Sequence, residues 1–229
     1  MTSRFAYTAP EELPAVVPVF PLTGALLLPR GILPLNIFEP RYLDMVDGAL
    51  KGDRLIGVIQ PQAALTDSAI PESPVGRPDL CATGCLGRIT GFQETEDERY
   101  MISLTGVARF RPVMELEAIT AYRQFRIDAT PFADDFEPLL GEDEVDRDKL
   151  LGAFQAFLDA NDMEADWPNV EKTGNETLVN ALSMMSPYGP REKQALLEAD
   201  DLRTRAEILV AITEMTLKSA DGPSSDHLQ

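Results

Sequence analysis

Short apolar or alternating runs, bounded by Pro, Gly and Asp, fill the first part of the chain. Runs of this length with alternating apolar positions are typical of β-strands. Because many of them follow one another closely, we expect a closed or strongly curved sheet. The predicted strands are Val16–Val19, Leu26–Leu28, Leu33–Ile37, Leu55–Gln60, Leu86–Phe92, Tyr100–Phe110 and Tyr122–Ala129.

A single short helix is predicted within this series of strands, beginning at Pro40. Proline suits the first helical position because its missing N–H would have no partner there, and Glu39 favours the positive end of the helix dipole. The apolar residues that follow at helical spacing form one face, which we expect to pack on the sheet. These residues are Tyr42, Met45, Val46, Ala49 and Leu50.

Three glycines, Gly84, Gly87 and Gly91, stand in the segment GCLGRITG. The segment lacks the lysine and the hydroxyl residue of a phosphate-binding loop, and it opens a strand rather than a helix. We therefore interpret these glycines as bulge or turn positions that let a curved sheet bend.

The period of the apolar residues changes in the second part of the chain. Residues 134–146 are acidic and contain Pro and Gly, a composition that suits a linker. We expect a β-rich subdomain over 1–133, a helical subdomain over 147–218 and a disordered tail over 219–229.

Four helices are predicted after the acidic segment. Asp146 or Asp148 is placed to cap the first, Pro187 stops the second, and Pro190 opens the third. Their apolar stripes run over Leu150–Leu158, Leu178–Met185, Ala195–Leu197 and Ile208–Met215.

Residues 61–84 contain four prolines and little periodicity. This stretch is longer than a compact domain normally tolerates in a connection without secondary structure. Two interpretations stay open: a flap over a binding surface, which would bring Pro71 and Pro74 to that surface, and a solvated insertion.

The charge is strongly negative and unevenly distributed. The formal net charge is −18, of which residues 134–229 contribute −14 from 8 basic and 22 acidic side chains. Such a field repels nucleic acid and anionic membrane surfaces, because affinity for both comes from Lys and Arg. We expect neither as a partner.

The two cysteines, Cys81 and Cys85, are too few for a disulfide framework. No apolar run approaches the length of a membrane helix, and the N-terminus does not have the pattern of a signal peptide. The expected location is a reducing cytoplasm. A structural role for the C-x3-C pair is the main interpretation, and a regulatory disulfide is the alternative.

Catalytic and metal-binding patterns were sought without success. The single histidine, His227, lies in the predicted tail, so neither a His-containing zinc site nor an oriented Ser–His or Cys–His pair is expected. There is no G-x-S-x-G motif. We expect no cofactor and no enzymatic activity; a hydrolase with an unrecognised active site is the alternative.

The segment VPVFPLTGALLLPRGILPLNIFEPRYLDMV, residues 17–46, closely resembles the N-terminal, substrate-binding domain of the Lon protease family. Later segments resemble the same domain in the same order: Ile56–Gln60, Gly84–Phe92, the GVARF of Gly106–Phe110, and Leu178–Leu209.

This resemblance implies an α+β protein, with a β-rich, PUA-like pseudobarrel that contains one short helix and is followed by a helical bundle. In full-length family members the ATPase and peptidase follow this region. Because the chain ends at Gln229, we expect both to be absent. The implied protein is a stand-alone Lon-type substrate-binding domain.

The implied function is recognition of unfolded or partner polypeptides, with a protease acting in trans as one way in which bound substrates would be used. RNA binding, known among PUA-like folds, is a further hypothesis that the charge of −18 opposes. The candidate partner-binding residues are Phe38, Arg41, Tyr42, Pro71, Pro74, Met184, Met185 and Tyr188. For Arg41 an ion pair with Glu39, and for Tyr42 a bracing contact, are the structural alternatives.

Overall fold

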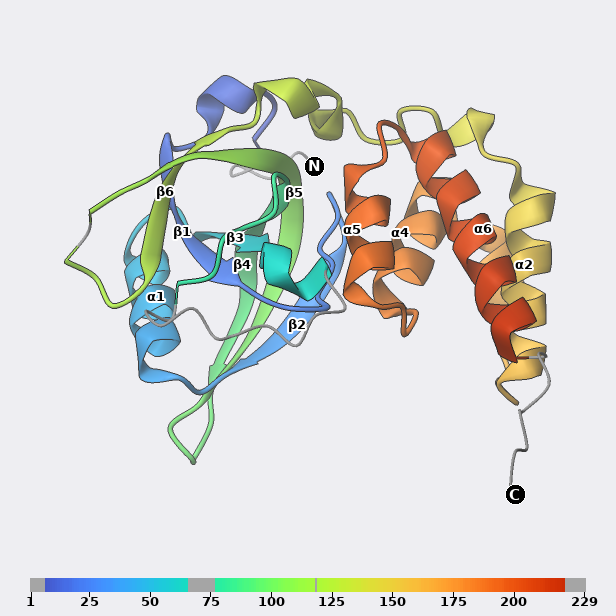
Figure 1. Cartoon of the computed structure of the whole chain (residues 1–229), viewed down its shortest axis with the longest axis horizontal. Helices are drawn as coiled ribbons and strands as arrows, with labels where there is room; N and C mark the ends of the chain where they lie inside the picture. The colour runs from blue at the N-terminus through green and yellow to red at the C-terminus, as the bar shows by residue number, and fades with distance from the viewer. Residues whose placement is uncertain (1–6, 66–76, 118, 221–229) are drawn as a thin grey trace, which may run out of the picture. The chain divides into compact units, whose positions relative to one another are not determined.

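The computed structural model describes residues 7–65, 77–117 and 119–220. It confirms the α+β class: a six-stranded sheet and several helices (Figure 1). A relationship to PUA folds stays a prediction. The strands are β1 (Val16–Pro21), β2 (Ile32–Ile37), β3 (Leu55–Ile59), β4 (Gly84–Glu94), β5 (Tyr100–Glu115) and β6 (Arg123–Asp128).

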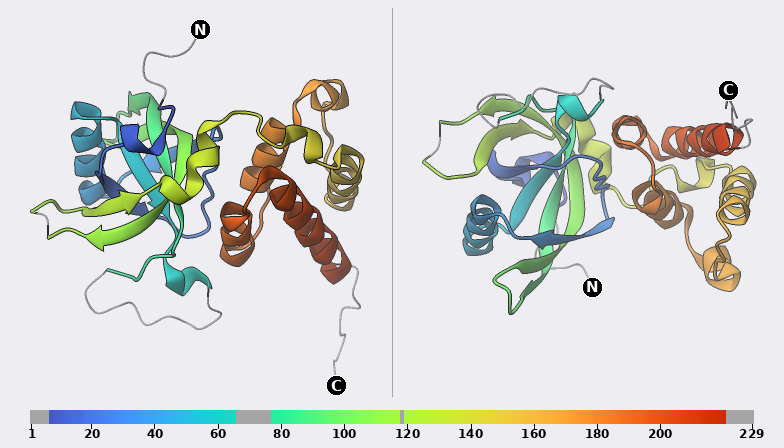
Figure 2. Two further views of the ribbon diagram at one scale, coloured as in Figure 1. Left: turned by 90° about the horizontal axis from the view of Figure 1, so that it is seen from above. Right: turned by 60° about the horizontal axis from the view of Figure 1, so that its bottom comes forward.

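The sheet is curled because β5 is long enough to pair with β2 and β4 along most of its length and with β6 at its far end. The strand order is β2-β5-β4-β3-β1-β6, and the far end of β5, Arg111–Glu115, also pairs with β6. β1 and β3 are parallel and the other pairs are antiparallel. The predicted curved sheet is thus confirmed (Figure 2).

Irregularities in the β4–β5 pairing occur where glycine was expected to bend the sheet. The register shifts between Leu86 and Gly87 and again between Ile89 and Gly91. At Gly87 a Cβ atom would lie 2.9 Å from the Cβ of Leu104 and 2.8 Å from a Leu27 methyl group. The missing side chain therefore allows β4 to pack closely on the core.

The predicted helix is α1 (Pro40–Lys51), with Pro40 in its first turn. The apolar face is buried, as expected, through Tyr42, Met45, Val46 and Ala49. α1 packs near β1, and burying a side chain the size of Met45 or Val46 contributes about 1.5–3 kcal/mol.

Leu26–Leu28 was predicted to be a strand, and this prediction was wrong. The three side chains are buried, but the segment has no regular secondary structure and follows a left-handed turn at Gly24 (φ 71°). It passes so close to β5 that a Cβ on Gly106 would lie 1.9 Å from the Leu28 carbonyl oxygen. The apolar run is explained by core packing alone.

Arg109, in the GVARF segment, forms a buried ion pair with Asp135. Asp135 accepts hydrogen bonds from the Arg109 backbone N–H (2.8 Å) and from its guanidinium (2.8–3.2 Å). The guanidinium also stacks on Phe132 at 4.7 Å and donates to the Leu197 carbonyl at 3.3 Å. Residue 135, predicted to lie in a solvated acidic linker, is instead fixed to β5 within the 3-10 segment η3 (Thr130–Phe136).

The helix α5 (Pro190–Glu198) belongs to the same compact unit as the sheet. Gln60, at the end of β3, donates to the Pro190 carbonyl at 2.9 Å and to the Gln194 side chain at 3.2 Å. Gln194 in turn donates to the Thr83 carbonyl at 3.2 Å. These buried polar bonds, together with Arg109, hold α5 against the strands.

The chain divides into two compact units, 1–140 with 184–198 and 141–183 with 199–229. The prediction placed 147–218 in one helical subdomain, whereas the structural division groups residues 184–198 with the strands. The polar bonds of Gln60 and Arg109 to α5 are the physical reason. The predicted folding domains themselves stay a prediction.

The second unit is helical. It contains α2 (Arg147–Ala160), α3 (Trp167–Lys172), α4 (Asn175–Met185) and α6 (Leu202–Ala220), although the last two residues of α4 are grouped with the sheet. α2 packs along α6 (Figure 2). Asp146, and not Asp148, caps α2 by accepting from the Lys149 N–H at 3.1 Å. The short α3 was not predicted, because six residues carry too little periodicity. No helix of the described residues is both long and apolar enough to cross a membrane.

Candidate functional site

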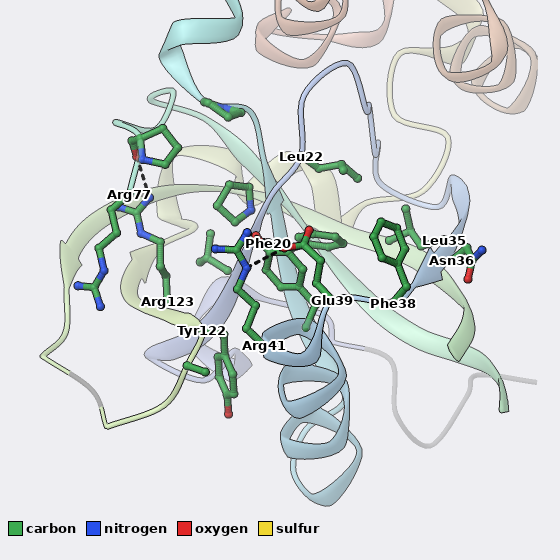
Figure 3. A pocket seen from close by; sticks show the side chains of 16 residues that line it. Phe20, Leu22, Leu35, Asn36, Phe38, Glu39, Arg41, Arg77, Tyr122 and Arg123 are labelled. Carbon is green, nitrogen blue, oxygen red and sulfur yellow. Dashed lines mark hydrogen bonds and ion pairs between the residues drawn. The ribbon is translucent and has the colours of Figure 1, made fainter. Parts of the chain in front are cut away.

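A pocket of about 530 Å³ lies where the end of β1, the end of β2 and the first turn of α1 meet (Figure 3). We refer to it as the α1 pocket. Its wall is completed by Pro61, by residues 77–78 and by residues 121–123 before and at the start of β6. All of these belong to the unit that contains the sheet.

The floor of the α1 pocket is aromatic and aliphatic. The rings of Phe20 and Tyr42 are 4.3 Å apart, and both residues are buried. Phe38, which precedes α1, is 62% exposed at the rim. Burial raises the pKa of Tyr42; the charge of Arg41 lowers this pKa and the charge of Glu39 raises it. Tyr42 is therefore a neutral phenol at pH 7.

An ion pair stands at the rim beside Tyr42. Arg41 donates to one Glu39 oxygen from Nε at 3.0 Å and from Nη2 at 2.7 Å, and its guanidinium stacks on Tyr42 at 4.7 Å. Both charged side chains are about half exposed. The interpretation of Arg41 and Glu39 as an ion pair is confirmed, and the bracing contact of Tyr42 is its stacking on Phe20.

Arg123 forms the opposite wall and is fully engaged. It makes a two-pronged contact with Glu115 (2.9 and 2.7 Å) and donates to the Pro78 carbonyl at 2.7 Å. The hydrogen bond from Arg123 lowers the pKa of Glu115. Arg77 approaches Glu115 only at 3.8 Å and is largely exposed. Three arginines and one carboxylate, Glu39, line the pocket, and Glu115 pairs with Arg123 beside it, which leaves a local excess of positive charge.

A second hollow of about 530 Å³ lies over β2, β5 and β4. It is lined on the solvent side by Pro34, Asn36, Gly91, Gln93, Met101 and Ser103, and we refer to it as the outer hollow. None of its lining residues is charged. Leu35 and Asn36 line both this hollow and the α1 pocket, so the two meet at β2.

The described lining of the α1 pocket contains no Ser, Thr, Cys, Lys or His. It therefore lacks the usual nucleophile and base of covalent catalysis. Among the described residues no group of His, Cys, Asp and Glu is arranged to hold a metal ion. What the pocket offers chemically is an apolar floor, stacking surface and guanidinium donors, which suits binding of a peptide segment.

Three of the residues predicted to bind a partner, Phe38, Arg41 and Tyr42, come together at this pocket. Met184 packs against Gly31, just before β2, and Met185 is 83% exposed. None of Met184, Met185 and Tyr188 lines the pocket. Pro71 and Pro74 lie outside the described residues, as does the part of the predicted flap from residue 66 to residue 76. A role in binding stays a prediction for all eight.

Glu115 and Arg123 were not among the residues predicted from the sequence. A signal existed in the pairing of β5 with β6, where Glu115 lies opposite Phe125. Arg123 stands two residues from Phe125, on the same face and diagonal to Glu115, where opposite charges attract. That signal required the strand register, which the sequence pattern alone does not supply.

Both cysteines are buried and neither forms a disulfide. Burial, with a smaller contribution from Glu198, raises the pKa of Cys81 to about 11. A thiol with this pKa is almost entirely protonated at neutral pH and is a poor nucleophile. The structure thus agrees with the structural interpretation of Cys81, and a regulatory disulfide receives no support from its chemistry.

Comparison with known sequences supports the resemblance noted above. A sequence model described as ATP-dependent protease La (LON) substrate-binding domain matches residues 16–214. "Lon protease 2" of Myxococcus xanthus is 25% identical over 211 residues, covering 88% of this chain and 24% of that protein. "Lon protease" of Anaeromyxobacter dehalogenans is 29% identical over 119 residues, covering 52% of this chain and 13% of that protein. The chain spans a quarter or less of the length of these relatives.

Two solved structures are similar in fold. The Lon N-terminal domain protein from Xanthomonas campestris matches with a TM-score of 0.58 and 23% identity, over 86% of this chain and 97% of that one. The N-terminal domain of the Mycobacterium avium complex Lon protease matches with a TM-score of 0.57 and 16% identity, over 93% and 100%.

Proposed function

Because the chain belongs to the family of Lon substrate-binding domains, we propose that it is a non-catalytic module that binds unfolded polypeptides at the α1 pocket. The observation that carries the proposal is the exposed Phe38 beside an open pocket with an aromatic floor. Aromatic side chains bury a large apolar area for little conformational entropy, which makes them effective binding residues.

The finer part of the proposal is that the module presents bound polypeptides to a protease that acts in trans. The family match is to the substrate-binding domain of a protease, which supports a role in recognising polypeptides that are to be cleaved. The charge of −18 opposes nucleic acid as the partner. A cytoplasmic location is part of the same proposal, supported by two cysteines that form no disulfide.

Binding is tested with fluorescently labelled α-lactalbumin that has been reduced and carboxamidomethylated, so that it stays unfolded. This polypeptide is acidic, so electrostatic attraction to a chain of net charge −18 does not explain its retention. We expect saturable binding by fluorescence anisotropy and no binding of native α-lactalbumin. Equal binding of both forms, or of neither, contradicts the proposal.

The place of binding is tested with Phe38→Ala, which removes an exposed side chain and leaves the core intact. We expect affinity to fall by about fivefold to thirtyfold, corresponding to roughly 1–2 kcal/mol at a binding hot spot. Leu139→Ala, at another exposed apolar residue of the same unit, is the matched control and should change nothing. Equal effects of the two substitutions would place binding elsewhere.

The role in trans is tested in a lysate of the source cells from which the protein has been depleted. We expect ATP-dependent degradation of the labelled unfolded probe to slow on depletion and to recover when the wild-type protein is added. Phe38→Ala protein should not restore it. Degradation that is unaffected by depletion would contradict a role in trans while leaving the binding proposal intact.

A further inference from the structure

β2 lies at an open edge of the sheet. Among the described residues it pairs with β5 alone, whereas the other end of the strand order, β6, is also paired with β5. An unpaired strand edge presents a row of backbone donors and acceptors to which another chain can add. The identity of these groups on β2 follows from the register.

Ser103 of β5 lies opposite Pro34 of β2. The Ser103 carbonyl accepts a hydrogen bond from Thr90 Oγ1 of β4 at 3.3 Å, so the backbone groups of Ser103 face β4 and not β2. Pro34 and Ser103 are thus a non-hydrogen-bonded pair, and Pro34 turns its nitrogen and its carbonyl to the open edge. This is the position in which a strand tolerates proline.

Backbone groups two residues apart in a strand point to the same edge. Ile32 and Asn36 therefore also direct their N–H and C=O groups to the open edge of β2. No described residue hydrogen-bonds to either of them there. The edge offers two donors and three acceptors in a row, with a gap only at Pro34.

The two hollows meet at this edge, where Leu35 and Asn36 line both of them. Leu33, Leu35 and Ile37 face the interior, where Leu35 lines the α1 pocket, while Pro34 and Asn36 face solvent beside Met101 and Ser103 in the outer hollow. A strand added to β2 would send successive side chains alternately to the two faces. Each hollow would then receive every second side chain.

Resting on the proposed function, we propose that an extended segment of the bound polypeptide adds to the open edge of β2. Its backbone bonds to Ile32, Pro34 and Asn36, and its alternate side chains enter the α1 pocket and the outer hollow. This mode of binding depends on backbone hydrogen bonds and on the alternation of side chains, so many different sequences can bind.

Charge complementarity specifies the occupant further. Arg41, Arg77, Arg123 and Glu39 line the α1 pocket of a chain whose net charge is −18, and Glu115 pairs with Arg123 beside it. The outer hollow has no charged lining. The preferred segment therefore carries an aromatic residue for the floor and an acidic residue two positions away on the same face, with uncharged side chains on the other.

The first experiment uses a capped nine-residue peptide with Phe and Glu two positions apart among Val and Thr. In one version N-methyl groups replace the N–H groups that would face β2, and in the other they replace the N–H groups that would face away from it. Only the first version loses the donors to β2. We expect that version to bind the wild-type protein about tenfold more weakly, as for loss of one or two hydrogen bonds, and the other to bind like the parent. Equal losses in both versions, or none in either, overturn strand addition.

The second experiment changes the protein. Asn36→Pro removes the N–H at the open edge while sparing the bonds to β5, and Asn36→Ala removes only the side chain. We expect about tenfold weaker peptide binding for the first and a change of less than about twofold for the second. Similar effects of the two overturn the proposal. If Asn36→Pro lowers the melting temperature, strand addition is judged instead from the binding of the two N-methylated peptides to the wild-type protein.

The charge preference is tested by replacing Glu of the peptide with Gln and with Lys. We expect affinity to fall in that order, and equal affinity of the three overturns the role of the arginines. If unfolded α-lactalbumin binds but the two N-methylated peptides bind equally well, the proposed function stands and strand addition is refuted. Absence of binding by both the unfolded protein and the peptide would refute both.

Discussion

At the scale of single residues, Arg109 and Asp135 form an ion pair in which both side chains are buried. Asp135 is 6% exposed and accepts from the backbone and the side chain of Arg109. Removing one partner of such a pair leaves an uncompensated buried charge, which is far more costly than losing an exposed pair.

We therefore predict that Asp135→Ala lowers the free energy of unfolding by about 3–5 kcal/mol, because Arg109 stays buried without its carboxylate. The neighbouring exposed Asp134→Ala is the matched control and should change stability by less than about 0.5 kcal/mol. Denaturant titration of the two variants measures both values. Similar stabilities would show that the ion pair does not hold η3 to β5.

Cys81 gives a prediction from its pKa, which burial raises to about 11. At pH 8 the thiolate is a small fraction of the thiol, so alkylation by iodoacetamide in the native state should be far slower than in denaturant. Mass spectrometry of a time course measures the rates. Rapid modification of Cys81 at pH 8 in the folded protein would contradict the burial and the pKa together.

At the scale of elements, the approach of β5 to the Leu26–Leu28 segment depends on Gly106. We predict that Gly106→Ala destabilises the protein by about 3 kcal/mol, because its Cβ would overlap the backbone at Leu28. Gly152→Ala in α2 has open space around it and should instead stabilise by up to about 1 kcal/mol. Thermal unfolding of both variants checks the contrast, and a harmless Gly106→Ala would refute the close packing.

Arg123 of β6 donates hydrogen bonds to Glu115 of β5 and so links the two strands. These bonds lower the pKa of Glu115. A lowered carboxyl pKa stabilises the fold above the usual carboxyl range, and this contribution is lost as the pH falls through the folded pKa. We predict that Glu115→Gln lowers the melting temperature by more at pH 7 than at pH 2.5. An equal effect at both pH values would mean that the charge of Glu115 is not what matters.

At the scale of the whole molecule, the unit that contains the sheet is made from two separate stretches, 1–140 and 184–198. The bonds of Gln60 and Arg109 to α5 link them. We predict that a fragment of residues 1–140 does not unfold cooperatively, and that adding a peptide of residues 184–198 increases its ordered structure. Circular dichroism with thermal unfolding tests this. A fragment that melts as sharply as the full chain would show that α5 is dispensable.

Periodicity and turn chemistry were enough to place most strands, because an alternating run such as Leu33–Ile37 has few other ways to bury its apolar side. Pro40 and the stripe from Tyr42 to Ala49 likewise determined α1 from sequence alone. The same reasoning failed for Leu26–Leu28, because a run of buried leucines does not reveal whether its backbone has a strand partner.

What the sequence by itself determined is therefore the family, the α+β class, the order of the main elements and three residues that meet at the α1 pocket. The tertiary structure decided the rest: that Asp135 is buried on Arg109, that α5 joins the strands, and that Arg123 faces the α1 pocket. Local pattern encodes which side chains seek burial, since that depends on neighbours in sequence. Which distant groups become partners depends on strand register and chain path, which only the folded chain specifies.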